Sequence, residues 1–254
     1  MSDIETTENN KNNFLPGQGS NSQEAAQRLQ DIGSSILRAA RDELYLGMRF
    51  LDVALSSFIY QMDGSVSPFG TDGAVMYFHP AQLGGLYKEN RILVNRGYLH
   101  MVFHCIFRHF GKPGIETRLW NLSCDIAVEH MIDGIYHRSV RYSRSLLRRE
   151  TYRLLEKEKK TLNAERIYKI LKEEFLKEKE LAQLEKEFYV DDHKYWANQQ
   201  PDRKPNPLMS KKWGDISEGI ETDLETFSRE AGEQDGDFLD QLKKDGYDLS
   251  YMKE

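Results

Sequence analysis

An apolar segment near the middle of the chain, "ILVNRGYLHMVFHCIFRHF", restricts the fold more than any other feature of the sequence. We predict that it belongs to the most apolar helix of the protein, which runs from about Asn90 to Phe110. The sequence "GKPG" at 111–114 ends this helix, because proline and glycine do not easily continue helical turns. A second apolar helix, "TRLWNLSCDIAVEHMIDG", follows and ends at Gly134, where a glycine cap is common.

The segments on either side of these two helices are predicted to be mostly helical as well. Apolar residues recur at helical spacing from about 26 to 53, as one bent helix or as two helices divided near Gly33 or Gly47. Residues 142–188 are rich in Lys, Glu and Arg but keep an apolar stripe, which is typical of amphipathic helices. Two short β-prone segments, "FIYQMD" and "AVMYFHP", flank "GSVSPFGTDG" and predict a hairpin. The predicted class is α+β, mostly helical, with a small β-hairpin or sheet beside the central helix.

Composition divides the chain into three predicted regions. Residues 1–22 are polar and rich in Asn and Ser, so we expect a disordered N-terminal tail. Residues 23–200 are expected to form the folded domain. Residues 201–254 are predicted to form an acidic, helical C-terminal extension.

The overall charge and composition exclude several classes of partner. With 39% hydrophobic and 30% charged residues, the chain has the balance of a soluble globular protein. A net charge of −6 argues against nucleic acid or an anionic membrane as a main partner. We see no apolar run of membrane-spanning length and no signal peptide. The two cysteines do not make a disulfide framework, so a cytoplasmic location is expected.

Two histidines in the central helix have the spacing of a helical metal site. His100 and His104 are four residues apart, so both imidazoles lie on one helix face and can reach one ion. The next helix offers Asp125 and Glu129, which are again four residues apart. Asp125 is the stronger candidate for a third ligand, because a carboxylate among apolar residues is costly unless it is paired or bound to a cation. The simpler alternative is a helix with hydrogen-bonded core histidines and a paired Asp125.

Several ordered motifs make the chain resemble a known bacterial family, the putative metallopeptidase domain, which often precedes a von Willebrand A-like domain. The resemblance extends from about Ala26 to Trp196. The motifs that carry it are "TDG", "VMYFHPAQL", "LVNRGYLHMVFHCIFRHFGK", "LWNLSCDIAVEHMID", "AERIYKIL" and "DDHKYW".

The resemblance implies a zincin-like fold, in which a small sheet lies beside the active-site helix and a second helix supplies the last ligand. It implies zinc as the metal and His100, His104 and Asp125 as its ligands. Asn121, one turn before Asp125, and the trailing His109 are then expected to orient the ligands by hydrogen bonds.

One position departs from the family pattern in a way that affects chemistry. The family's His-Glu-x-x-His glutamate is Met101 here, and a thioether cannot accept a proton from metal-bound water. Loss of a general base lowers a rate by about a hundred- to ten-thousandfold, while the ligands are untouched. Glu129, Asp192 and His193 are the candidate replacements.

The sequence therefore predicts a degenerate metallopeptidase relative that binds zinc and acts as a protein-interaction module. The resemblance implies an AAA+ ATPase or a von Willebrand A-like protein as its partner. The protein either lacks a von Willebrand A-like module or works with one that is encoded elsewhere. Two alternatives stay open at this point. One is an active metal-dependent hydrolase that uses another base, and the other is a structural domain without metal.

Overall fold

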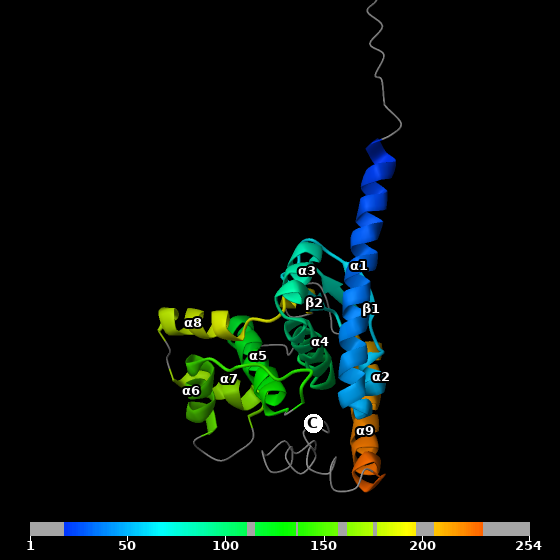
Figure 1. Ribbon diagram of the computed structural model, residues 1–254. Helices are drawn as coiled ribbons and strands as arrows, with labels where there is room; N and C mark the ends of the chain where they lie inside the picture. The colour runs from blue at the N-terminus through cyan, green and yellow to red at the C-terminus, as the bar shows by residue number, and fades with distance from the viewer. Residues whose placement is uncertain are drawn as a thin grey trace, which may run out of the picture.

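The computed structural model describes residues 18–110, 115–135, 137–156, 162–174, 177–196 and 206–230 of the 254-residue chain. Within these residues the protein is mostly helical with one small sheet (Figure 1). The first half contains, in order, α1 (Gln18–Gly47), η1 (Arg49–Leu51), α2 (Asp52–Leu55), β1 (Ile59–Met62), β2 (Phe69–Thr71), β3 (Val75–Phe78), α3 (Pro80–Glu89) and α4 (Arg91–Ile106). The second half contains α5 (Thr117–Gly134), α6 (Leu146–Leu155), α7 (Ala164–Glu173), α8 (Glu178–Phe188), η3 (His193–Tyr195) and α9 (Pro207–Glu230).

Helix α4 is the central element of the fold. Thirteen consecutive residues, Val94–Ile106, are buried, which agrees with the apolar helix predicted from the sequence. Asn90 caps its N-terminus, because the Asn90 side chain accepts a hydrogen bond from the amide of Ile92. Helices α1, α3, α5 and α9 pack against α4. Figure 1 shows α4 between the long α1 and α9 on one side and α5–α8 on the other.

The three-stranded sheet differs from the predicted hairpin. The two predicted strands do form, as β1 and β3, but they pair in parallel, with Ile59 opposite Val75. A short third strand, β2, lies inside the segment expected to be a turn and pairs antiparallel with β3. The strand order is β1-β3-β2, so the hairpin is formed by β2 and β3. The prediction of a β1–β3 hairpin was wrong because the connection contains a strand, and this strand allows β3 to run in the same direction as β1.

Helix α5 connects two hydrophobic cores. Val128, Met131 and Ile132 of α5 belong to the core that is built by α1, α4, the sheet and α9. Trp120 and Ile126 of the same helix belong to the second core, which α6, α7, α8 and Trp196 complete. The predicted bounds of this helix are confirmed, since α5 covers Thr117–Gly134. The α4–α5 contact therefore lies at the junction of both cores, shielded from water.

The structure describes the regions of some of the remaining sequence predictions but not of others. The N-terminal helix is continuous to Gly47, so the break falls at the second of the two candidate glycines. Residues 1–17 of the predicted tail and residues 201–205 and 231–254 of the predicted extension lie outside the described residues, while residues 18–22 of the predicted tail form the start of α1. Within the extension, α9 packs onto α4, and Trp213 and Ile220 of α9 are buried in the first core. Among the described helices, none is long and apolar enough to cross a lipid bilayer.

Candidate metal centre

Helix α4 directs His100 and His104 into the junction between the two cores. Both side chains are fully buried, and their Nε2 atoms lie 2.7 Å apart. Their position depends on close packing against strand β2. A Cβ atom on Gly97 would lie 2.4 Å from the ring of Phe69, so glycine is needed for α4 to approach this strand.

The other side chains of the cluster come from α5 and from the segment after α8. Asp125 of α5 points toward the two histidines, and its Oδ1 lies 3.3 Å from Nε2 of His104. The segment after α8 brings Asp191 and His193, both buried. It is anchored by a backbone hydrogen bond of 2.8 Å from the Asp192 amide to the Phe69 carbonyl.

Five donor atoms converge on one point in this junction. One nitrogen or carboxylate oxygen from each side chain lies within 4.8 Å of all the others, and the five residues are His100, His104, Asp125, Asp191 and His193. Nε2 of His193 is 3.1 Å from Oδ1 of Asp125 and 3.0 Å from Oδ1 of Asp191, yet none of these three atoms makes a hydrogen bond of acceptable geometry. The three atoms therefore lie close together without being satisfied by one another. Buried polar atoms without a partner are rare, and here they need an occupant.

The separations match those between the ligands of one metal ion. Ligands at 2.0–2.2 Å from one zinc ion lie roughly 3.3–3.6 Å from one another in tetrahedral geometry, and roughly 2.8–4.4 Å when five ligands surround the ion. Nε2 of His100 lies 3.5 Å from Oδ1 of Asp125 and 3.4 Å from Oδ1 of Asp191. Among the histidine–carboxylate pairs the longest separation is 3.8 Å, from His104 Nε2 to Asp191 Oδ1, and the two histidine Nε2 atoms lie closer together, at 2.7 Å. Three imidazoles and two carboxylates are also suitable donors for a divalent transition metal.

The charges of the cluster suit a divalent cation as well. Burial lowers the pKa of His104 to about 4, helped by the charge of His100. Burial also opposes the charge on His193, but Asp125 and Asp191 outweigh it and raise the pKa of His193 to about 10. The same carboxylates, with Glu129, raise the pKa of His100 against the effect of burial. The buried carboxylates thus favour positive charge at this place, which a divalent ion would also supply.

A buried ion-pair network contacts His100 on the side of its ring that faces away from the cluster. Oε1 of Glu129 lies 2.9 Å from Nδ1 of His100, which fixes Nε2 as the atom that faces the cluster. Oε2 of Glu129 accepts hydrogen bonds from Arg96, at 2.5 Å, and from Arg148. Burial alone would raise the pKa of Glu129, but Arg96, His100 and Arg148 hold it well below its usual value. The two arginines thus favour the charged form of Glu129, which contacts and orients His100.

His109 has a corresponding position beside His104. A left-handed residue, Arg108 with a φ of 53°, turns the chain after α4, and the Nδ1 atoms of His104 and His109 lie 2.9 Å apart. Trp196 closes the centre on another side, stacked on His193 with ring centroids 3.8 Å apart. The cluster is thus enclosed by aromatic rings as well as by the two cores.

The structure brings the three predicted ligands together. The other predicted site residues lie in different places around them. His193, proposed as a base, joins the cluster itself. Glu129 lies behind His100, and Asp192 turns away, where its carboxylate accepts a hydrogen bond from the Lys194 amide. Asn121 has a buried Oδ1 with no hydrogen-bond partner among the described residues. Met101 is fully buried in the first core.

Sequence reasoning missed Asp191 and Arg96. Asp191 stands next to Asp192 in the doublet "DDH", and nothing in the sequence shows which carboxylate is turned inward. Arg96 lies four residues before His100 on the same face of α4, and an arginine inside the most apolar helix could have signalled a buried anion.

The fold and the cluster define an α+β, mostly helical protein with a buried His/Asp centre able to hold a metal ion. A protein-family model described as "Putative metallopeptidase domain" matches residues 34–241, so the chain belongs to this family. No curated protein matches the chain, and no solved structure matches it either.

The two adjacent aspartates provide a matched test of this centre. Asp191→Asn removes a carboxylate charge from the cluster, and we expect the affinity for a divalent metal to fall about 10- to 100-fold, the range typical of altered metal surroundings. Asp192→Asn keeps the capping oxygen of η3 and is expected to leave the affinity unchanged. Competition with a coloured chelator measures both variants. Equal affinities in the two variants would contradict the assignment of Asp191.

Proposed function

We propose that this chain is a degenerate member of its family, which holds a zinc ion in a closed centre and acts through binding rather than through peptide hydrolysis. The observation that carries the proposal is the number of donor side chains. Catalytic zinc sites have three protein ligands and keep one position open for water, whereas structural sites are closed by protein. Here five side chains converge on one point, and together they would leave a bound ion little room for water.

The residues around the centre support the same conclusion. Met101 follows His100 at the position where a zinc peptidase has its glutamate, and its side chain is packed in the first hydrophobic core. A thioether neither accepts nor donates the proton that peptide hydrolysis requires. Bound zinc would supply positive charge, and the surrounding residues would determine whether that charge serves hydrolysis or only binding.

The candidate replacement bases are engaged elsewhere. Both carboxylate oxygens of Glu129 are occupied, one by His100 and the other by Arg96 and Arg148. His193 contacts Asp125 and Asp191 within the cluster. Asp192 caps η3. These contacts favour a closed centre over an active hydrolase that uses another base.

A closed centre at this place would connect three separate parts of the chain. His100 and His104 come from α4, Asp125 comes from α5, and Asp191 and His193 come from the segment after α8. Without a cation, two carboxylates are buried at the junction of two cores. A cation bound by all five residues would hold the segment after α8 and the second core against α4.

A peptidase assay tests this proposal. We expect the zinc-loaded protein to show no chelator-sensitive cleavage of unfolded casein or of a fluorogenic peptide library. We also expect no gain in Met101→Glu, because Asp191 and His193 still fill the positions that water would need. The His100→Ala, His104→Ala variant gives the background rate. Cleavage by the parent protein that is abolished both by a chelator and in this double variant would refute the proposal.

A further inference from the structure

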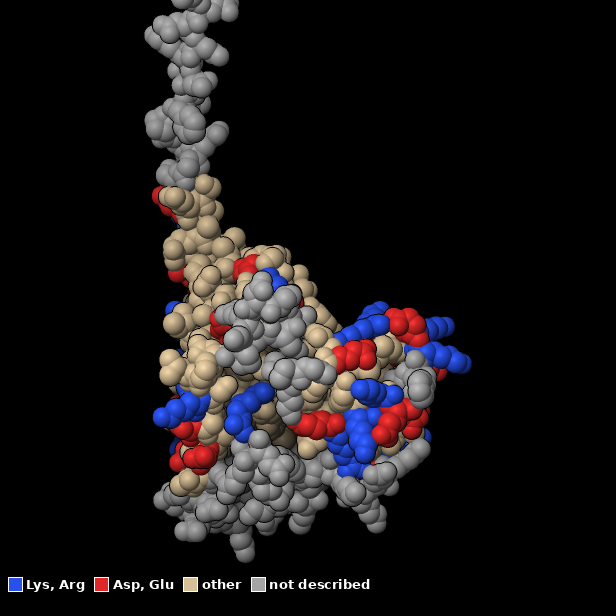
Figure 2. All heavy atoms as spheres, turned by 180° about the vertical axis from the view of Figure 1, so that it is seen from behind, with Lys and Arg blue, Asp and Glu red and all other residues tan. Residues whose placement is uncertain are grey.

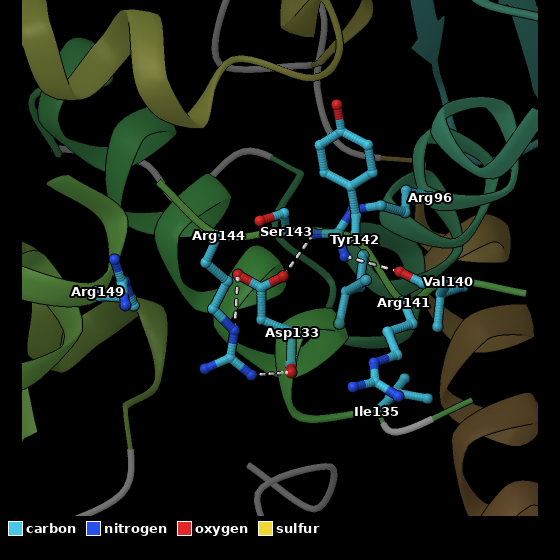
Figure 3. Close-up of a pocket in the computed structure, with 10 residues that line it drawn as sticks. Arg96, Asp133, Ile135, Val140, Arg141, Tyr142, Ser143, Arg144 and Arg149 are labelled. Carbon is cyan, nitrogen blue, oxygen red and sulfur yellow. Dashed lines mark hydrogen bonds and ion pairs between the residues drawn. The ribbon is translucent and has the colours of Figure 1, made fainter. Parts of the chain in front are cut away.

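A pocket lies at the C-terminal end of α5. The Arg96–Glu129 pair lies between this pocket and the metal centre. The pocket has a volume of about 400 Å³ and is lined by the end of α5, the turn that follows it, and the start of α6. Figure 3 shows the labelled side chains around it. This volume lies within the range of about 300–1,000 Å³ that is typical of small-molecule pockets.

The walls of this pocket carry a concentration of arginines. Arg96, Arg141, Arg144 and Arg149 line it, and Asp133 is the single carboxylate among the lining residues. The negative charge of Asp133 is already used, because it forms ion pairs with Arg96, at 2.8 Å, and with Arg144 and Arg148. The pocket is therefore strongly positive, although the whole chain has a net charge of −6.

Two of these arginines are available for a ligand. Arg141 and Arg149 are exposed, and neither forms an ion pair with any of the described residues. In Figure 3 Arg141 lies beside Ile135, and Arg149 stands on the far side of Arg144. Elsewhere on this half of the protein, basic and acidic side chains lie close together, as the right-hand part of Figure 2 shows for the region of α6–α8. Arginines left unpaired at the rim of a pocket suit an anion, because guanidinium groups bind phosphate through pairs of hydrogen bonds.

The floor of the pocket is apolar. Ile132, Ile135 and Val140 line it and are almost completely buried. Tyr142 and Ser143 add two hydroxyl groups near the rim. A bare phosphate ion would leave the apolar floor and most of the 400 Å³ unused. A ligand that has both a phosphate and an apolar or aromatic group would use both parts.

We propose that this pocket binds a small organic phosphate, whose phosphate group is held by arginines of the rim and whose apolar part lies beside Ile135 and the exposed ring of Tyr142. The site is separate from the metal centre, and its existence does not depend on the proposed function. The two are nevertheless connected by one wall residue. Arg96 lines the pocket and also donates to Glu129, which contacts His100.

Calorimetric titration of the full chain at low ionic strength tests the proposal with three small probes, and an oligoglutamate peptide serves as a further comparison. Phenyl phosphate is expected to bind at least about tenfold more tightly than inorganic phosphate, and phenol is expected not to bind. Arg141→Gln with Arg149→Gln is expected to weaken phenyl phosphate at least about tenfold, because charge-assisted hydrogen bonds are lost. Both arginines are exposed, so an unchanged melting temperature is expected for the double variant.

Arg138→Gln is the matched control. Arg138 is also exposed and lies in the same turn, but it does not line the pocket. An equal loss of affinity in Arg138→Gln would show that only the general charge of the region matters, and would overturn the proposal. Binding of inorganic phosphate as tight as that of phenyl phosphate, or tighter binding of an oligoglutamate peptide, would overturn the assigned ligand class. Absence of binding by all three probes at millimolar concentration would overturn the site itself.

Discussion

Protein purified without chelators is expected to contain about one equivalent of zinc per chain, and the His100→Ala, His104→Ala variant is expected to contain none. The physical reason is the convergence of five buried donor atoms, of which the variant loses two. The three remaining residues come from α5 and from the segment after α8, so the variant has no ligand left on α4. Elemental analysis by mass spectrometry measures the metal content directly.

Loss of the metal is also expected to lower stability by a large amount. An ion present at a thousand times its dissociation constant stabilises the folded state by about 4 kcal/mol. For a chain of this size this corresponds to a shift of roughly 8–16 °C in melting temperature. Addition of a chelator should therefore lower the melting temperature of the parent protein and have no effect on the double variant.

The control for this prediction is His130→Ala. His130 also lies on α5, but its Nε2 contacts Glu156 at 2.7 Å, and His130 does not belong to the cluster. We expect His130→Ala to keep its metal and its sensitivity to chelators. A parent protein that contains no metal after purification, and that neither takes up zinc nor gains stability from it, would contradict both the centre and the proposed function.

The parts of this centre that could be predicted are those that depend on helix geometry. The i, i+4 spacing places His100 and His104 on one face wherever the helix lies, and the apolar surroundings of Asp125 indicate burial on the next helix. Helix α5 has the predicted bounds, whereas α4 ends at Ile106, four residues before the predicted end, and the left-handed Arg108 turns the chain before the predicted GKPG stop. Where the chain forms a regular helix, the face on which a side chain lies can thus be predicted from the sequence.

The parts that could not be predicted depend on loops and on contacts between distant segments. Asp191 and Asp192 are adjacent, and contacts with distant or later residues, the hydrogen bonds from the Asp192 amide to Phe69 and from the Lys194 amide to the Asp192 carboxylate, accompany the inward position of Asp191. The parallel pairing of β1 and β3 depends in the same way on β2, which the turn-like composition of its segment concealed. The role of Glu129 was also unreadable, since it requires Arg148 from α6 beside Arg96 from α4.

Glu129→Gln is expected to destabilise the fold strongly, even when no metal is bound. Glu129 is almost completely buried and forms ion pairs with Arg96 and Arg148, whose side chains are also largely buried. Removal of one charge from a buried network leaves the partner charges uncompensated, which costs about 3–5 kcal/mol. Asp133 offsets part of this cost, because it also contacts both arginines. Urea unfolding in the presence of a chelator measures the change in free energy of unfolding apart from any effect of metal.

A second effect of Glu129→Gln should appear only when metal is added. Glutamine no longer holds Nδ1 of His100 by a charged hydrogen bond, so we expect the affinity for metal to fall about 10- to 100-fold as well. Glu156→Gln is the matched control, because Glu156 also contacts a histidine but is half exposed. An exposed pair contributes about 0–1 kcal/mol, and Glu156 lies outside the cluster, so neither stability nor metal affinity should change greatly. If Glu129→Gln and Glu156→Gln gave equal losses in both measurements, the Arg96–Glu129–Arg148 network would be neither a stabilising element nor the support of His100.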